Sequence, residues 1–348
     1  MVVASPNSSL TTSSKPSAAD TATTTAAARI PTIDLSDGTS NRQALSKLLV
    51  EASEKYGIFK LINHGIPQDC ISRAEEEAMA FFAKPTAEKL AASPKSSPVD
   101  AGNTTRFGYG INNIGRHGDI GEIEYLLLSS QPSLISQLAF SVSQNPSKFS
   151  CALNDYIQAT KNVACELLDL MAEGLGISDN SIFSRMILDS QSDSLLRINH
   201  YRPLPDFIHP SPSNKLGFGE HSDPQIFAIL RSNDIAGLQI LLDDGLWVPV
   251  PPDPTAYYVM IGDLFQVFTN GRFGSLKHRA TANIGPRSRM SMTFFASPSL
   301  DTWISPLPEM VTADQPCIYR PFTWREYKTY IYSLTLAGSR LDSFKIRP

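Results

Sequence analysis

The chain has 348 residues, of which 42% are hydrophobic, and its formal net charge is −4. This length and composition allow a substantial core in one large domain with added helices. The charge excludes a strongly basic surface for nucleic acid, and no apolar run reaches the ~18 residues that span a bilayer. The cysteines Cys70, Cys151, Cys165 and Cys317 have no paired spacing, which predicts free thiols in a reducing compartment.

Residues 1–28 consist mainly of small and hydroxylated side chains. Such a segment buries too little apolar surface to offset the entropy lost on ordering, so we predict that it is disordered. Its Ser and Thr content also fits a plastid transit peptide, although Lys15 and Arg29 are the only basic residues near it. We expect a cytoplasmic protein, with the nucleus or plastid import as alternatives.

An N-terminal region is expected over residues 29–135. Its periodicity and turn residues predict a strand at 29–35, an amphipathic helix at 41–56, a strand at 57–67 and a helix at 68–82. His64, beside a Gly/Pro turn, is interpreted as a structural histidine rather than a ligand. A glycine-rich path over 107–128 ends in an apolar strand.

Supporting helices are expected over 136–190, with a long helix at 147–176 and a shorter one at 181–188. Over 191–300 the pattern changes to short apolar strands separated by Gly, Pro, Asn and Asp. Regularly spaced short strands predict a double-stranded β-helix, or jelly roll. The segment 301–348 should hold a last helix that Thr323 caps. We therefore predict a mixed α/β (α+β) fold with a jelly-roll core and N-terminal and supporting helices.

The stretch GFGEHSDP (217–224) places His221 and Asp223 two residues apart. In an extended segment both side chains project to one side. Imidazole nitrogen and carboxylate oxygen suit divalent iron, manganese or zinc, and His278 is a candidate third ligand. An isolated pair of this kind more often lies in a solvated loop. Two histidines and one carboxylate would leave other metal positions open, as in non-haem Fe(II) oxygenases.

Two further pairs of polar residues are also two positions apart on predicted strands, so each pair shares one strand face. Arg289 and Ser291 lie in an apolar strand, where a guanidinium fork and a hydroxyl can grip a carboxylate. The alternative for Arg289 is an edge-strand charge or a salt bridge. Asn199 and Tyr201 share a face in the stretch LRINHY (196–201). The ordered set N-x-Y, H-x-D, H and R-x-S, each on a β-type segment, is improbable by chance.

This set resembles that of the plant 2-oxoglutarate- and Fe(II)-dependent dioxygenases, over about residues 30–347. Within that superfamily the chain is most similar to the gibberellin 2-oxidases. The supporting stretches are FGYG (107–110), GDIG (118–121), EYLLL (124–128), ACELLDLMAEGL (164–175), GFGEHSDPQI (217–226), ILRSN (229–233), TNGRF (269–273) and FTWREYK (322–328).

The resemblance implies a role for each motif. One group of residues would hold Fe(II), another would bind 2-oxoglutarate, and O2 would be the oxidant, with ascorbate in support. The implied metal ligands and catalytic residues are His221, Asp223 and His278, and the implied co-substrate residues are Asn199, Tyr201, Arg289 and Ser291. The implied reaction is hydroxylation of a gibberellin at carbon 2, which inactivates the hormone.

The resemblance also implies that the glycine-rich path contributes to the mouth of the site. Here the chain departs from the gibberellin 2-oxidase pattern, with Asn113 where a basic residue is usual and Glu122 where tryptophan is usual. A diterpenoid acid would favour a cation near its carboxylate, so both departures bear on the substrate. The candidate substrate contacts are Phe107, Tyr109, Asn113, Tyr327 and Lys328, the last with a solvated charge as its alternative.

Two other functions stay open at this stage. The same chemistry could act on another gibberellin position or on another small plant metabolite. A non-catalytic jelly-roll protein could use the same ligands for another metal, although such a binder would have no need of the Arg289 and Ser291 clamp. In each enzyme hypothesis the partner is a small molecule, with no nucleic acid and no membrane, and protein partners are left open.

Overall fold

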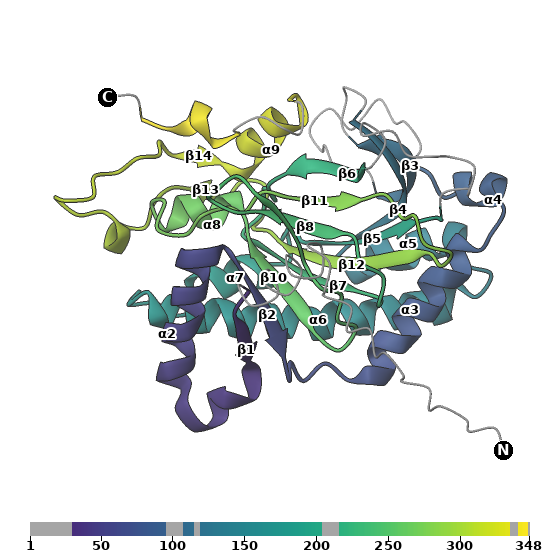
Figure 1. Ribbon diagram of the computed structural model, residues 1–348, viewed down its shortest axis with the longest axis horizontal. Coiled ribbons are helices and arrows are strands. Elements are labelled where there is room, and N and C mark those ends of the chain that lie inside the picture. The colour runs from purple at the N-terminus through teal and green to yellow at the C-terminus, as the bar shows by residue number, and fades with distance from the viewer. Residues whose placement is uncertain (1–29, 95–106, 115–118, 204–215, 335–339, 347–348) are drawn as a thin grey trace, which may run out of the picture.

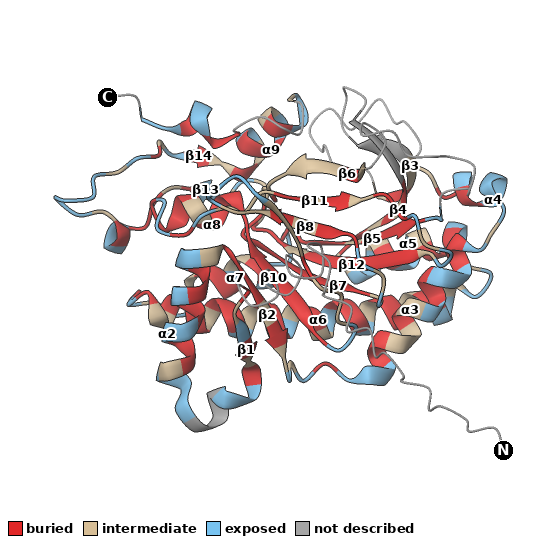
Figure 2. Ribbon diagram, in the orientation of Figure 1, coloured by how far each residue is buried: buried red, intermediate tan, exposed pale blue. Residues whose placement is uncertain are grey.

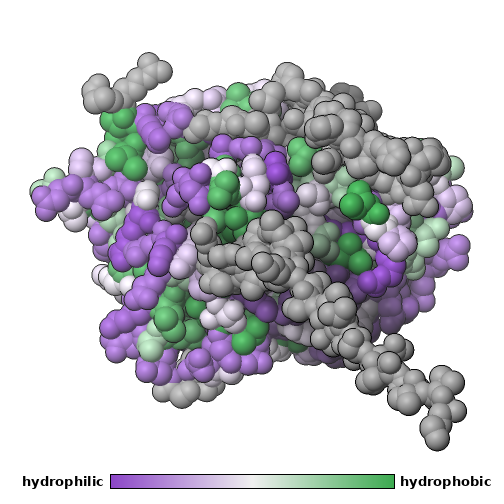
Figure 3. All heavy atoms as spheres, viewed as in Figure 1, coloured by the Kyte–Doolittle hydropathy of each residue, from purple (hydrophilic) through white to green (hydrophobic). Residues whose placement is uncertain are grey.

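The structure, a computed structural model, describes residues 30–94, 107–114, 119–203, 216–334 and 340–346 (Figure 1). Within these ranges the side chains of 38–40 and 112–122 are left out. The predicted disorder of residues 1–28 lies outside the described part. Among the described helices, none has both the length and the hydropathy needed to cross a membrane. On the face in Figure 3, hydrophobic residues are scattered among hydrophilic ones.

The described strands form one large sheet, one smaller sheet and a two-stranded pair. The large sheet has eight strands in the order β1-β2-β10-β7-β12-β5-β4-β3, and β1 with β2 is its parallel pair. Its strands are β1 (Thr32–Asp34), β2 (Ile58–Ile62), β10 (Tyr257–Ile261), β7 (Phe227–Ser232), β12 (Arg289–Ala296), β5 (Leu195–Tyr201), β4 (Asp119–Ser129) and β3 (Gly108–Ile114). The second sheet contains β6 (Leu216–His221), β11 (His278–Thr281), β8 (Leu238–Leu241) and β9 (Trp247–Pro249). A short pair joins β13 (Trp303–Ile304) to β14 (Phe322–Thr323).

The large sheet has two different faces because side chains alternate along each strand. In β7, Phe227 and Ile229 join the main core, whereas Ala228 and Leu230 join a smaller core that faces the second sheet. All six residues of β7 are buried, as expected for a strand covered on both sides. The inner face therefore lies between two sheets, where a cavity can form.

Helices cover the outer face of the large sheet, and Figure 2 shows their buried sides turned towards it. The longest, α6 (Pro146–Gly174), begins at Asn145, whose side chain accepts a hydrogen bond from the Lys148 amide at 3.1 Å. The other helices are α2 (Gly38–Tyr56), α3 (Gln68–Phe82), α4 (Thr86–Leu90), α5 (Pro132–Val142), α7 (Ile182–Leu188), α8 (Asp263–Phe268) and α9 (Trp324–Tyr332). In the described part of the chain, short 3-10 helices cover Leu35–Asp37, Pro308–Met310 and Leu341–Phe344.

The predicted fold class is confirmed, since two facing antiparallel sheets with covering helices form a jelly roll. The expected cap of the last helix is present, because the Thr323 hydroxyl accepts from the Glu326 amide at 3.2 Å. The long and short helices lie within two residues of their predicted bounds. Two helices, α5 and α8, were not among the predicted elements.

Candidate metal and co-substrate site

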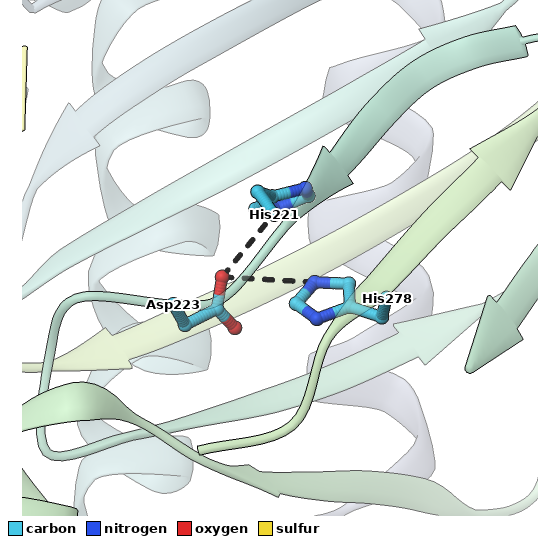
Figure 4. Close-up of side chains that lie close together, drawn as sticks. All are labelled: His221, Asp223 and His278. Atoms are coloured by element: carbon cyan, nitrogen blue, oxygen red, sulfur yellow. Dashed lines mark ion pairs between the residues drawn. The ribbon is translucent and has the colours of Figure 1, made fainter. Parts of the chain in front are cut away.

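Three potential metal ligands meet at one end of the second sheet. His221 ends β6, His278 begins β11, and the antiparallel register places these two residues opposite each other. Asp223 follows β6 in the next loop. The Nε2 atom of each histidine lies 3.6 Å from Asp223 Oδ1, and the three potential ligand atoms lie within 4.8 Å of one another (Figure 4). The pairing of β6 with β11 thus brings together residues that are far apart in sequence.

Backbone carbonyls orient both imidazole rings. His221 Nδ1 lies 2.8 Å from the Gly219 oxygen, and His278 Nδ1 lies 3.3 Å from the Leu276 oxygen. Carbonyl oxygens only accept, so each Nδ1 must carry the proton. In the neutral form of each ring, Nε2 then carries a lone pair towards Asp223, which is the arrangement that metal-binding histidines require.

The buried carboxylate of the triad keeps one unsatisfied oxygen among the described residues. Asp223 is 3% exposed, and its Oδ2 has no hydrogen-bond partner in the described ranges. Burial raises the pKa of Asp223, although His278 opposes this shift. Burial and the neighbouring His278 lower the pKa of His221 well below its usual value. A buried carboxylate and two imidazoles whose Nε2 atoms lie beside it form a donor set that fits a divalent transition metal.

A buried arginine lies on the facing strands. Arg289 is 2% exposed, its Nε and Nη1 have no hydrogen-bond partner among the described residues, and burial lowers its pKa. Its Cζ lies 4.9 Å from the centre of the Tyr201 ring. The register of β12 and β5 pairs Arg289 with Tyr201 and Ser291 with Asn199. These four side chains share one cavity wall, and the unused guanidinium hydrogens fit a carboxylate.

Two glycines leave space for this wall. A Cβ at Gly237 would lie 2.8 Å from Arg289 Cδ and Nε, and one at Gly217 would lie 2.7 Å from Tyr201 Cδ1. Real Cβ atoms do not approach that closely, so a side chain at either position would displace a residue of the wall. Gly217 lies on β6 together with His221. The strand that carries a potential metal ligand therefore also leaves the space that Tyr201 occupies.

The metal ligands and the arginine wall line one cavity of about 320 Å³. Its other sides are largely apolar and come from both sheets and from the end of α9. Arg340 closes one edge, and its Nη1 donates to the Ser222 carbonyl at 3.1 Å, directly between two of the potential metal ligands. The apolar lining includes Leu127, Leu195, Phe218, Leu230, Leu238, Met260, Phe295, Ile331 and Leu334. The space suits a small molecule with a hydrocarbon skeleton.

Four of the predicted substrate contacts, Phe107, Tyr109, Tyr327 and Lys328, do not line this cavity. Tyr109 donates to Glu124 at 2.7 Å, Tyr327 donates to Asp263 at 2.6 Å, and Lys328 donates to Asp193 at 2.5 Å. All three side chains are buried, so the alternative of a solvated Lys328 is wrong. The polar groups of these three residues are thus used in hydrogen bonds outside the cavity. The partly buried Phe107 is also absent from the cavity lining. The side chains of Asn113 and Glu122 lie outside the described part.

Sequence reasoning missed Tyr125 and Arg197, which line the cavity. A signal was present for Arg197, because it precedes Asn199 by two residues on β5 and must share its face. Tyr125 lies opposite Asn199 in the pairing of β4 with β5. The glycine-rich path therefore reaches the cavity through Tyr125 and Leu127 rather than through Tyr109.

Family profiles match two parts of the chain. The profile of the 2OG-Fe(II) oxygenase superfamily matches residues 192–298, which contain all of the potential metal and co-substrate residues. The profile of the N-terminal region of non-haem dioxygenases in morphine synthesis matches residues 30–134.

Curated relatives cover nearly the whole chain. Gibberellin 2-beta-dioxygenase 4 of Arabidopsis thaliana is 47% identical over 325 residues, which are 91% of this chain and 94% of that protein. Gibberellin 2-beta-dioxygenase of Phaseolus coccineus is 44% identical over 317 residues, 91% of each chain. Among solved structures, JOX2 in complex with 2OG, Fe and JA is 28% identical with a TM-score of 0.77, covering 91% of this chain and 89% of that one.

Proposed function

This chain belongs to the gibberellin 2-beta-dioxygenase family of the 2OG-Fe(II) oxygenases, and we propose that it hydroxylates a gibberellin at carbon 2, which inactivates the hormone. The observation that carries the proposal is the cavity, which joins a potential metal triad, an apolar wall and a buried arginine with two nitrogens that have no partner in the described ranges. The enzyme is a dioxygenase that uses Fe(II) and 2-oxoglutarate.

We assign the Fe(II) to His221, Asp223 and His278. The orphaned Asp223 Oδ2 and the two free Nε2 lone pairs support this assignment. When bound there, Fe(II) supplies the activation of O2, which is coupled to decarboxylation of the 2-oxo acid. The protein holds the ligand geometry in advance, since carbonyls fix both imidazoles and Arg340 holds the backbone of Ser222.

We assign the distant carboxylate of 2-oxoglutarate to Arg289 and Ser291, with Tyr201 and Asn199 beside them. Arg289 offers Nε and Nη1 to the cavity, and a planar fork fits a carboxylate through two parallel bonds. Pairing Arg289 with an anion would also offset the cost of burying its charge. The apolar residues on the other side exclude water and orient a hydrocarbon substrate.

The four cysteines of the chain are unpaired in the structure, which supports a reducing compartment and hence a cytoplasmic location. Import of the intact protein into isolated plastids would test the alternative. We expect the protein to stay outside the plastids and to keep its full length.

Product analysis by mass spectrometry tests the function. The purified protein would be incubated with Fe(II), ascorbate, 2-oxoglutarate and a panel of nineteen- and twenty-carbon gibberellins. We expect a product heavier by one oxygen and hydroxylated at carbon 2, with one succinate released per turnover. Hydroxylation at another carbon would contradict the regiochemistry, and untouched gibberellins with continued 2-oxoglutarate decarboxylation would contradict the substrate.

A further inference from the structure

Arg197 is a second arginine of the cavity, and its guanidinium is held rigidly. Its Cζ lies 4.1 Å from the centre of the Tyr125 ring and 5.0 Å from that of the Phe218 ring. Its Nε donates to Asn199 Oδ1 at 2.7 Å. A cation stacked on aromatic rings and tied at one nitrogen has a fixed direction.

One end of this guanidinium has no acceptor. Arg197 Nη2 is buried and finds no hydrogen-bond partner in the ranges that the structure describes. By contrast Arg279, also at the cavity, donates to Gln239 at 2.8 Å and stacks over Trp247 at 4.0 Å. A buried donor without an acceptor is costly and rare in native proteins. The arrangement of Arg197 therefore indicates an acceptor that arrives with a ligand.

Arg197 and Arg289 occupy different places in the cavity. On the paired strands β5 and β12, Arg197 lies opposite Thr293 and Tyr201 lies opposite Arg289. Four residues separate these positions on each strand, which corresponds to roughly 13 Å. Each guanidinium also lies over its own tyrosine ring. Arg197 and Arg289 are thus two separate cations on the wall formed by β5 and β12, and one 2-oxoglutarate clamp accounts for only one of them.

The surroundings of Arg197 suit an acid with an apolar skeleton. Leu127 is its partner on β4, and Leu195 lies two residues before it on the same face; both line the cavity. A glycine makes room for the aromatic support, because a Cβ at Gly110 would lie 2.3 Å from Tyr125 Cζ. A cation set among leucines and aromatic rings matches a carboxylate carried on hydrocarbon rings.

We propose that Arg197 binds the carboxylate of the substrate and so selects acids over their neutral analogues. The inference rests on the proposed function, since it names the contact by which a gibberellin would be held. It also supplies the cation that the substitution of Asn113 for a basic residue removes from the expected position. Tyr125 and Phe218 then act as positioning residues for the guanidinium.

Calorimetric binding of a nineteen-carbon gibberellin and of its methyl ester tests this role. The full-length enzyme would carry Mn(II) and 2-oxoglutarate, in the absence of O2. We expect the native protein to prefer the acid by about tenfold or more, as one charge-assisted contact provides. In Arg197→Met the ratio should fall to about one, and in Arg197→Lys it should be intermediate. The matched control Arg42→Met, at an exposed pair with Glu173, should keep the native ratio.

The ratio of the affinity for the acid to the affinity for the ester, measured in each variant, separates the possible roles of Arg197. An Arg197→Met protein that keeps the native preference would overturn the inference. An equal loss of affinity for acid and ester would also overturn it, since that pattern indicates a purely structural role or an effect on Asp223. If Arg197→Met does not fold, as its melting curve would reveal, the Arg197→Lys ratio decides.

Failure of the proposed function would look different. The native protein would then oxidise no gibberellin while its 2-oxoglutarate decarboxylation continued. The same binding comparison would be made with dehydroabietic acid and its methyl ester, which are diterpenoid probes outside the gibberellin class. A preference for that acid, lost in Arg197→Met, would support the carboxylate contact, and no preference in the native protein would overturn it.

Discussion

Strand β5 carries polar side chains on both faces, and the two sets differ in how completely their hydrogen bonds are satisfied. On the cavity face, Arg197 and Asn199 share a wall with Arg289, and both arginines keep nitrogens without partners among the described residues. On the opposite face, His200 donates through Nδ1 to Glu124 at 2.8 Å. Adjacent residues of one strand therefore serve two different kinds of polar environment.

The polar cluster on the opposite face of β5 has nearly all of its hydrogen bonds satisfied. Glu124 is 1% exposed, and it accepts from Lys89 at 2.6 Å and from Tyr109 at 2.7 Å as well as from His200. Burial alone would raise its pKa, but the hydrogen bonds from His200, Lys89 and Tyr109 outweigh burial and lower it to about 2. His200 Nε2 is the one atom of this cluster without a partner in the described ranges.

The comparison teaches how to tell a structural charge from a functional one. Glu124 and Asp223 are equally buried carboxylates, yet the pKa of Glu124 is lowered and that of Asp223 is raised. The first has its cations within the fold, and the second has an oxygen free for a metal. Burial is therefore a poor guide to function, and hydrogen-bond satisfaction is a better one.

The largest expected effect follows from removing the carboxylate of Asp223, which has one unsatisfied oxygen among the described residues. Asp223→Ala should lower 2-oxoglutarate-dependent turnover by more than about 100-fold, because replacing even outer-shell partners of metal ligands costs 10–100-fold. The melting temperature of the metal-free protein should not fall, since an unsatisfied buried group is lost. Steady-state assays and thermal unfolding measure both. The exposed Asp243 offers a control, and native activity in Asp223→Ala would refute the metal assignment.

Removing the charge of Glu124, whose carboxylate is hydrogen-bonded within the fold, should lower the stability of the protein rather than its activity. Glu124→Gln leaves Lys89 buried without a counter-charge, and we expect the free energy of unfolding to fall by about 3 kcal/mol. Denaturant titration measures this loss. Glu326→Gln, at an exposed pair with Arg320, is the control and should change stability by less than about 1 kcal/mol. A fully stable Glu124→Gln protein would contradict the structural role.

The same substitution should change the pH dependence of stability. The folded-state pKa of Glu124, about 2, lies below its ordinary value of 4.5. The ionised group therefore contributes stability above pH 4.5, and this contribution is lost as the pH falls from 4.5 towards 2. Unfolding titrations across this window should show a flatter profile for Glu124→Gln than for the native protein. Identical slopes would place the pKa of Glu124 near its ordinary value.

A smaller effect is expected at the co-substrate clamp. Arg289→Lys keeps the charge but loses the planar fork, so the KM for 2-oxoglutarate should rise about tenfold, the equivalent of one charge-assisted hydrogen bond. The KM for the gibberellin should change little, because Arg197 lies elsewhere on the strands. Initial-rate kinetics with each substrate varied in turn would separate the two. An unchanged KM for 2-oxoglutarate would make Arg289 a structural residue.

The smallest effect concerns the glycine behind that arginine. Gly237→Ala would place a Cβ 2.8 Å from Arg289 Cδ, and a shift of the guanidinium should raise the KM for 2-oxoglutarate about fivefold. The control is Gly274→Ala, where an added Cβ meets nothing within 4 Å among described atoms. Equal KM values for the two variants would show that the wall tolerates movement.

The period of two predicted much of this arrangement. It placed Arg289 with Ser291 and Asn199 with Tyr201, and the structure brings each pair to one cavity face. The sequence could not assign Tyr109 or Lys328, because their acceptors are set by tertiary packing; Asp193 lies 135 positions from Lys328. Arg197 carried the right period but was passed over in an apolar strand. Local patterns show which side chains share a face, whereas their partners depend on the fold.

The hydrogen bond from Arg340 to the Ser222 carbonyl joins positions 118 apart in the chain. Contacts that close such long loops form late, because the loop entropy must be lost before the contact contributes. During synthesis the ribosome releases His221 and Asp223 well before Arg340. The loop between two potential iron ligands is therefore synthesised before the residue that holds it, and this contact can form only after Arg340 has left the ribosome.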